Sequence, residues 1–303
     1  MEHLRIILKN HTNPAYGGAL VGARQVAQRL GCTIDHRAPA TPDSPQEQSA
    51  LVDEAIAERP DAIVLLPAHA TEVNGAIARV NAAAIPLVLF VSEPSTGHWA
   101  GFIGSDDTRM AASLAHHVLR RLRPDARVAF IDGHPGSITT PQRRRGFEQA
   151  LAQYPRMRLV DTACGYYQHA PGREAALQLL DRQPELDAIL SANDLMAMGA
   201  LEALASRQRA VALASINGTP DAIAAVRAGR LVATASFNTH RFGCLAVEMA
   251  LRHLRGERVP RRIDLVPDLI DAGNAADWDQ PYEQRSCPDW DQTVASAAEP
   301  AAA

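Results

Sequence analysis

Short apolar runs alternate along the chain with longer segments in which apolar residues recur every three or four positions. The short runs, such as AIVLL at 62–66 and LVLFV at 87–91, are apolar almost throughout, as are strands that are buried on both faces. The longer segments have the spacing of one face of a helix. Because strands and helices alternate, we predict an α/β fold in which helices cover both faces of parallel sheets.

The pattern places nine strands and nine helices in sequence. We expect strands at 4–8, 33–36, 62–66, 87–91, 128–131, 159–163, 188–191, 211–216 and 232–236. Helices are expected at 15–30, 46–58, 71–83, 107–122, 141–153, 172–182, 194–206, 220–228 and 241–255. Thr71 and Thr219 are predicted to cap the N-termini of helices, and Gly31 and Gly229 to end helices.

The strand–helix pattern occurs twice, which predicts two doubly wound lobes. We expect the N-terminal lobe to hold residues 1–103 and 237–265, and the C-terminal lobe to hold 104–236 and 266–274. The crossings near 103–106, 236–238 and 265–268 then form a three-stranded hinge. Residues 275–303 are expected to be a tail whose end, ASAAEPAAA, is disordered.

Composition narrows the classes of protein. The 303 residues include 47% hydrophobic residues and carry a net charge of −4, which suits a globular protein and argues against nucleic-acid binding. No apolar run has membrane-spanning length. The first residues, MEHLRIILKN, do not resemble an export signal, so the chain as written is expected to be cytoplasmic or to have lost such a signal.

The cysteines give no indication of a metal site or a redox motif. Cys32, Cys164, Cys244 and Cys287 are widely spaced and no C-x-x-C occurs. We expect them to be ordinary thiols.

Several motifs, in their order and spacing, carry a resemblance to a known family. They include IGSDD, RRRGFEQAL, PELDAILSANDLMAMGALEAL and INGTPDAIAAVRAGRLVATASF. Over residues 5–271 the chain resembles the type I periplasmic binding proteins of the sugar-binding group near ribose-binding protein. The effector domains of lactose-repressor-type regulators share that fold. The resemblance implies a periplasmic location and two lobes that close on a small ligand in the cleft between them. It implies no cofactor.

The resemblance places half of the candidate ligand-binding residues in the N-terminal lobe. Lys9 stands where a small polar residue is usual, and Asn13 and Tyr16 follow the first strand. Ser92 and Glu93 lie near the position of a family Asp-Arg pair, and Glu93 is expected to replace part of that pair. Asn13 also has an alternative role, as the N-cap of the helix that begins at Pro14.

The other candidates follow in the C-terminal lobe and, for Phe237, at the crossing that leads out of it. Arg143 matches the family's binding arginine, Tyr167 a stacking aromatic residue and Asn193 a binding asparagine. Asn217 stands where sugar-binding relatives usually carry an aspartate, and Phe237 where an amide is usual. For Arg143 the alternative is a solvated helix start, for Asn217 a structural turn. Tyr166 is the rival of Tyr167, and Asp194 is expected to cap the next helix.

These substitutions deplete the carboxylates of a pentose or hexose pocket while Lys9 and Arg143 remain. We therefore expect a ligand other than plain ribose: a modified or acidic sugar, or a polyol. Enzyme motifs such as G-x-x-x-x-G-K-[ST], G-x-G-x-x-G and G-x-S-x-G are absent, so no catalysis is expected and no catalytic or metal-binding residue is assigned.

The favoured function is that of the substrate-binding protein of an ABC-type importer, with a membrane permease as its partner. The alternatives are a sensor that docks on a receptor or kinase, and an isolated effector domain of a transcriptional regulator. A whole repressor is not expected, because the first strand begins at residue 4 and leaves no room for a helix-turn-helix.

Overall fold

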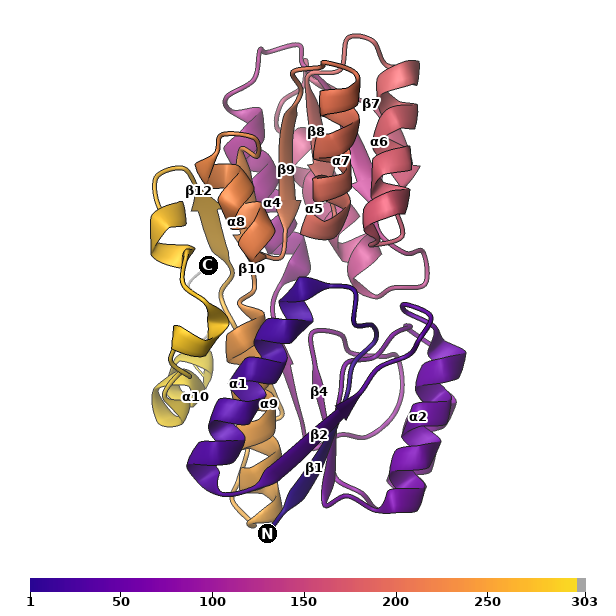
Figure 1. Cartoon of the computed structure of the whole chain (residues 1–303), viewed down its shortest axis with the longest axis vertical. Coiled ribbons are helices and arrows are strands. Elements are labelled where there is room, and N and C mark those ends of the chain that lie inside the picture. Colours follow the sequence, from indigo (N-terminus) through magenta and orange to yellow (C-terminus); the bar gives the residue numbers. More distant parts are fainter. Residues whose placement is uncertain (299–303) are drawn as a thin grey trace. The chain divides into compact units, whose positions relative to one another are not determined.

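The structure is a computed structural model in which residues 1–298 are described, and it consists of two compact units. Lobe 1 holds Met1–Ser105, Thr239–Val266 and the chain from Pro281 onward. Lobe 2 holds Asp106–Asn238 and Pro267–Gln280. Each lobe is a parallel-dominated sheet between two layers of helices, which confirms the predicted α/β class (Figure 1).

Lobe 1 is built on a six-stranded sheet in the order β11-β5-β4-β3-β1-β2, and all of its pairings are parallel. Helices α1 and α9 pack together on one face of the sheet, and α2 and α3 cover the other (Figure 1). The strands are β1 (His3–Ile7), β2 (Thr33–Arg37), β3 (Ala62–Leu65), β4 (Leu87–Phe90), β5 (Gly101–Gly104) and β11 (Arg262–Asp264). The helices are α1 (Pro14–Leu30), α2 (Pro45–Glu58), α3 (Asn74–Ala82) and α9 (Thr239–Leu254).

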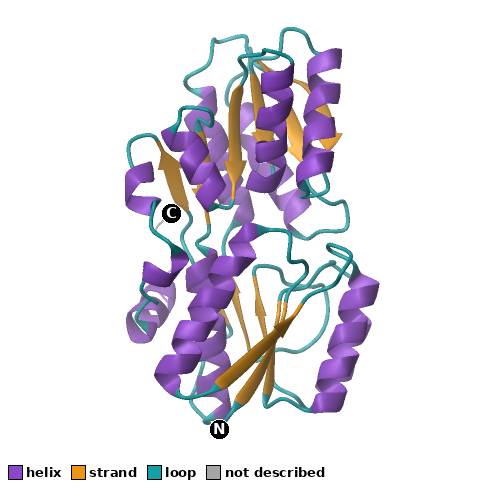
Figure 2. Cartoon of the chain, in the orientation of Figure 1, coloured by secondary structure: helices purple, strands orange, loops and turns teal. Residues whose placement is uncertain are grey.

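Lobe 2 repeats this arrangement with the strand order β12-β10-β9-β8-β6-β7, in which only β12 runs antiparallel to its neighbour. Helices α4 and α5 pack together on one face, and α6, α7 and α8 cover the other (labelled in Figure 1; Figure 2 shows the same view with helices and strands distinguished by colour). The strands are β6 (Arg127–Asp132), β7 (Arg158–Cys164), β8 (Ala188–Ser191), β9 (Ala212–Ile216), β10 (Ala233–Ser236) and β12 (Asp268–Asp271). The helices are α4 (Asp107–Leu119), α5 (Thr139–Leu151), α6 (His169–Arg182), α7 (Asp194–Ser206) and α8 (Pro220–Arg227).

The predicted helix ends are correct in part. Thr219 caps α8, since its side chain accepts from the Ala222 amide, and Gly31 ends α1 with a φ of 74°. The prediction for Thr71 was wrong, because α3 begins only at Asn74 and has no side-chain cap. The backbone amide of Thr71 instead donates to the His69 ring, and this hydrogen bond holds a turn ahead of the helix.

The last part of the chain is structured and divided between the lobes. The chain passes from lobe to lobe after Ser105, Asn238 and Val266, and again after Gln280. In lobe 2 this part forms η1 (Ala275–Trp278), and in lobe 1 it forms η2 (Tyr282–Gln284) and α10 (Trp290–Ala298). Disorder was expected over 295–303; residues 295–298 lie in α10, and the others lie outside the described residues.

Two cysteines that were expected to be thiols are instead bonded to each other. Cys244 on α9 and Cys287 form a disulfide, with their Cα atoms 5.7 Å apart, whereas Cys32 and Cys164 are free. The two cysteines are 43 residues apart, and local sequence does not predict the pairing because it depends on the end of the chain folding back on α9. Among the described residues, no helix has both the length and the apolar character needed to cross a membrane.

Candidate functional site

Most of the predicted ligand-binding residues lie just after strands, whereas Tyr16 and Arg143 lie in helices α1 and α5. In open parallel sheets, ligands bind at the carboxyl ends of the strands, because those ends lead into the loops that carry functional side chains. Lobe 1 supplies Lys9, Asn13, Tyr16, Ser92 and Glu93, and lobe 2 supplies Arg143, Tyr167, Asn193, Asn217 and Phe237.

In lobe 1, Lys9 is buried just after β1, next to a buried carboxylate. Its Nζ lies 3.6 Å from Oδ1 of Asp43, and both side chains are about 95% or more buried. The same Oδ1 accepts a 3.0 Å hydrogen bond from the Asn10 amide. The Asp43 backbone N–H also donates to the Lys9 carbonyl at 2.8 Å. The positive charge of Lys9 is thus compensated within its own lobe, as burial of an ammonium group requires.

Asn13 caps α1, as its alternative role predicted. Its Oδ1 accepts from the Ala15 amide at 3.1 Å, and its own backbone N–H donates to Oδ1 of Asn10 at 3.0 Å. Tyr16 lies buried in the first turn of the same helix. Capping fixes the position of Asn13, and its role toward a ligand stays a prediction.

Ser92 and Glu93 follow β4 but have different surroundings. Ser92 is buried, and among the described residues its Oγ has no hydrogen-bond partner; the same holds for Oδ2 of Asp43. Oε2 of Glu93 accepts instead from Arg262 on β11 at 2.7 Å, in a partly exposed ion pair. The structure therefore gives Glu93 a partner on the neighbouring edge of the sheet.

In lobe 2, Arg143 on α5 is 3% exposed, so the alternative of a solvated helix start was wrong. Its Nε donates to Oδ1 of Asp107 at 2.6 Å, and its Nη1 donates to the Ala192 carbonyl at 2.5 Å. Nη1 also lies 3.5 Å from Oδ1 of Asn217. These contacts fix the planar guanidinium and compensate its charge.

The two tyrosines that competed for one role face different surroundings. Both have positive φ angles, 53° for Tyr166 and 60° for Tyr167. Tyr166 is exposed and packs its ring edge-on against His134, whereas Tyr167 is buried. Gly133 lets the Tyr167 ring approach the backbone, since a Cβ there would lie only 2.0 Å from Cζ of the ring. Tyr167 is therefore the tyrosine of this pair that joins the Arg143 cluster.

Two aromatic rings flank Arg143. Its Cζ lies 5.8 Å from the centroid of the Tyr167 ring and 5.7 Å from that of Phe237, within the range of a cation–π attraction. The Tyr167 hydroxyl is held in turn by the hydroxyls of Thr139 and Thr140, at 2.9 and 3.0 Å. The structure thus brings Arg143, Tyr167, Asn217 and Phe237 together.

Asn193, rather than Asp194, caps α7, so the prediction for Asp194 was wrong. Oδ1 of Asn193 accepts from the Met196 amide at 2.9 Å, and its Nδ2 donates to the Tyr167 carbonyl at 3.2 Å. Asn193 thereby connects the start of α7 to the loop that carries Tyr167.

The Asp194 carboxylate instead accepts hydrogen bonds from several neighbouring elements of lobe 2. Its carboxylate accepts from the hydroxyls of Ser215 (2.5 Å), Thr219 (3.0 Å) and Thr234 (2.7 Å), and from the Thr219 amide (2.7 Å). Complete burial raises the pKa of the Asp194 carboxyl, an effect that the four donors oppose. This network ties α7, β9, α8 and β10 together around the loop that contains Asn217.

That loop holds Asn217 in a backbone conformation that favours glycine. Its φ is 144°, and its N–H donates to the Ala235 carbonyl at 2.7 Å. Gly218 follows with a φ of 65°, and a Cβ there would lie 2.5 Å from Cβ of Ser236. The turn is therefore set by the backbone, while the Asn217 side chain reaches Arg143.

Sequence reasoning missed the two carboxylates that pair with the buried cations. Asp107 follows Asp106, which is the N-cap of α4 in the structure: its Oδ1 accepts from the Arg109 amide at 2.8 Å. Asp43 lies in a loop without any motif. Nothing in the local sequence shows that Asp107 meets Arg143, 36 residues later.

Comparisons with known proteins agree with this architecture. The model of the family described as "Periplasmic binding protein domain" matches residues 5–258. The ribose import binding protein of Bacillus subtilis (strain 168) is 27% identical over 251 residues, covering 83% of this chain and 81% of that protein.

Two solved structures are similar in fold. A periplasmic solute-binding protein of an ABC transporter from Actinobacillus succinogenes 130z, with bound D-allose, has a TM-score of 0.87 and 22% identity; the match covers 91% of this chain and 100% of that one. An ABC transporter solute-binding protein from Mycobacterium smegmatis, with bound glycerol, has a TM-score of 0.85 and 26% identity, over 91% of this chain and 96% of that one.

Proposed function

Because the chain belongs to the periplasmic binding protein family, we propose that it is the substrate-binding protein of an ABC-type importer and that its ligand is an uncharged sugar or polyol. The relatives support the class of ligand, since they bind ribose, D-allose and glycerol according to their names. The choice of an uncharged ligand comes from the electrostatics of this chain's own residues.

The observation that carries the proposal is that both cations among the candidate residues already have a buried carboxylate partner. Lys9 is paired with Asp43, and Arg143 with Asp107. A ligand carboxylate in reach of these pairs would add an uncompensated negative charge beside two buried aspartates, which is costly where water is excluded. The acidic-sugar alternative is therefore disfavoured, and sugars and polyols without a charge remain.

The polar atoms at the carboxyl ends of the strands in each lobe can form hydrogen bonds with the hydroxyl groups of a ligand. A hydroxyl both donates and accepts, so it can satisfy an amide such as that of Asn217 and an acceptor such as Asp43 Oδ2. Among the described residues, Asp43 Oδ2 and Ser92 Oγ are buried without a hydrogen-bond partner, a condition that a ligand hydroxyl would relieve. We assign Lys9, Asn13, Tyr16 and Ser92 of lobe 1, and Arg143, Tyr167, Asn217 and Phe237 of lobe 2, to ligand binding. Asn193 and Glu93 are assigned to positioning.

We expect one ligand to be held by the carboxyl edges of both lobes, so that binding favours their closure about the chain crossings after Ser105, Asn238 and Val266. A membrane permease would then recognise the closed form. Small-angle scattering with and without ligand tests this part, because closure reduces the radius of gyration. An unchanged radius of gyration in the presence of a proven ligand would contradict it.

A thermal-shift screen of matched pairs tests the ligand class. Each pair consists of a neutral pentose, hexose or polyol and the acid derived from it. A ligand at about 100 times its dissociation constant adds roughly 2.7 kcal/mol of stability, which corresponds to several degrees for a protein of this size. We expect a shift with one neutral member and none with its acid. A shift with the acid alone would refute the uncharged ligand, and no shift with any pair would refute a carbohydrate ligand.

Ser92→Ala tests the site itself. The Ser92 Oγ has no partner in the described chain, so its removal is expected to leave the free energy of unfolding unchanged or slightly higher. Loss of a hydroxyl contact should weaken ligand binding about tenfold, which corresponds to about 1.4 kcal/mol. The control is Ser215→Ala, whose Oγ donates to Asp194 at 2.5 Å. It should lower stability by about 1–3 kcal/mol. Unchanged affinity in Ser92→Ala would remove Ser92 from the site.

A further inference from the structure

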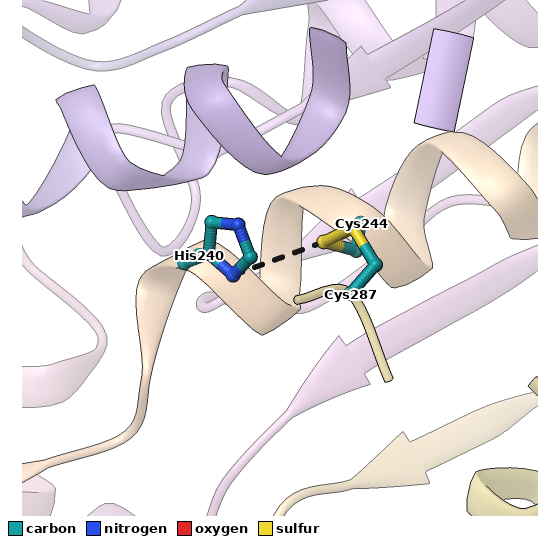
Figure 3. Close-up of side chains that lie close together, drawn as sticks. All are labelled: His240, Cys244 and Cys287. Carbon is teal, nitrogen blue, oxygen red and sulfur yellow. Dashed lines mark hydrogen bonds between the residues drawn. A yellow bond between two sulfur atoms is a disulfide. The ribbon is translucent and has the colours of Figure 1, made fainter. Parts of the chain in front are cut away.

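Three potential metal ligands converge at one point of lobe 1 (Figure 3). His240 and Cys244 lie one turn apart on α9, and Cys287 comes from the segment between η2 and α10. The ring nitrogen of His240 and the two sulfur atoms all lie within 4.8 Å of one another. His240 and Cys244 are buried and Cys287 is half-buried, so the cluster is enclosed but reachable from one side.

A hydrogen bond fixes which nitrogen of His240 faces the sulfur atoms. Nε2 lies 2.8 Å from Oε1 of Gln25 on α1, and a carboxamide oxygen can only accept, so Nε2 carries the proton. Nδ1 therefore keeps its lone pair, and it lies 3.9 Å from Sγ of Cys244 (Figure 3). Metal-binding histidines typically donate their other N–H to such an oxygen, which holds the ring in the binding orientation.

We propose that His240, Cys244 and Cys287 form a zinc site when the Cys244–Cys287 disulfide is reduced. Two thiolates and a neutral imidazole are a common ligand set for zinc, and with Zn²⁺ they give a site of zero net charge that suits a buried position. An oxygen ligand would complete four-coordination. The Gly22 carbonyl is a backbone candidate, since it lies 3.7 Å from Sγ of Cys287.

The disulfide and the zinc site are alternative states of the same two sulfur atoms. A dithiol reductant breaks the S–S bond, is itself oxidised to a disulfide, and leaves Cys244 and Cys287 as thiols. Zn²⁺ then binds both sulfur atoms and Nδ1 of His240, and the two thiol protons are released to water. In the reverse direction a small-molecule disulfide is reduced to two thiols with two protons from water, the two protein sulfur atoms join, and the metal must leave.

Cadmium binding to the full chain tests the proposal, because Cd²⁺–thiolate bonds absorb in the ultraviolet. Zn²⁺ is then added and should displace the Cd²⁺. The protein is freed of metal and reduced with a trialkylphosphine, which becomes the phosphine oxide. We expect one ion per reduced chain and none per oxidised chain. Re-oxidation of the loaded protein should release one ion. Gln25→Ala should weaken binding about 10- to 100-fold, because it frees the His240 ring.

Matched cysteine variants separate this site from adventitious thiols. Cys32→Ser/Cys164→Ser removes the two free cysteines and should keep one ion per chain, whereas Cys287→Ser should lose it. Circular dichroism shows whether each variant folds. If a variant fails to fold, the comparison of oxidised with reduced wild-type protein decides the question. Equal binding by the oxidised and reduced chains, or full binding by Cys287→Ser, would overturn the proposal.

Discussion

Asn217 shows at the scale of one residue how the backbone limits the choice of side chain. Its φ of 144° lies where side chains larger than hydrogen are strained, at a cost of about 1–3 kcal/mol. We propose that Asn217 is kept here for its ligand-binding amide, and the Asp194 network on the neighbouring elements holds the strained turn.

Two substitutions separate the strain from the side chain. Asn217→Gly and Asn217→Ala both remove the amide, but only Gly relieves the strain, so Asn217→Gly should be about 1 kcal/mol more stable than Asn217→Ala. Urea denaturation measures this difference, and both variants should bind ligand equally weakly. A more stable Asn217→Ala would show that the turn relaxes at no cost.

Which residues follow strands could be predicted at this scale, and which partners they have could not. Arg143 was identified from the family resemblance, and Asn217 from that resemblance and its place after a strand. The pairing of Arg143 with Asp107, and that of Lys9 with Asp43, depends on residues 36 and 34 positions apart folding to the same place. Local pattern contains no such information.

At the scale of elements, helices α1 and α9 approach unusually closely because glycines line their contact. A Cβ on Gly243 would lie 1.9 Å from the Ala19 carbonyl oxygen, and one on Gly22 would lie 2.2 Å from the His240 carbonyl oxygen. This glycine-lined contact between α1 and α9, called the seam below, positions Gln25 opposite His240 and so builds the cluster that we propose to bind zinc.

Gly243→Ala should therefore push the helices apart and lower the free energy of unfolding by about 1–3 kcal/mol. Gly17→Ala is the matched control on α1, because a Cβ there meets nothing within 4 Å. It should instead raise stability by up to about 1 kcal/mol, through helix propensity alone. Urea denaturation measures both variants. Equal effects of the two substitutions would show that the seam does not restrict packing.

His117 connects α4 to β12 and should make stability depend on pH. Burial, with the charges of Arg121 and Arg120, lowers the pKa of His117, while Asp271, 3.3 Å from Nε2, opposes the shift. As pH falls below 6.5, the ordinary value, the unfolded chain takes up a proton that the folded chain does not. The contribution of His117 is thus present above pH 6.5 and lost in acid.

The stability difference between wild type and His117→Gln should accordingly shrink as the pH is lowered. Urea denaturation at neutral and mildly acidic pH measures it, because the variant cannot titrate at this position. A difference that grows in acid would mean that Asp271 dominates and that the pKa is raised.

At the scale of the whole molecule, strand–helix alternation was sufficient to predict the fold class, because each buried strand and each amphipathic helix has a local pattern. It was insufficient for the end of the chain. Trp290 is buried, and the centroid of its ring lies 5.1 Å from Cζ of Arg252. The Tyr282 ring packs on Gly18. These contacts join segments more than 30 residues apart, which periodicity does not describe.

The disulfide is the covalent consequence of that fold-back, and its removal should affect the whole chain. It closes a loop of 43 residues that leaves lobe 1, supplies Pro267–Gln280 to lobe 2 and returns. Constraining such a loop in the unfolded state typically stabilises a protein by about 2–4 kcal/mol.

Calorimetry of the reduced protein with a chelator present should therefore show a lower melting temperature than that of the oxidised protein. Cys32→Ser/Cys164→Ser should show the same decrease on reduction, because its disulfide is intact. Zinc should restore part of the loss in reduced wild type, since binding to the folded state alone adds stability. An unchanged melting temperature on reduction would mean that the disulfide itself adds nothing to the stability of the fold.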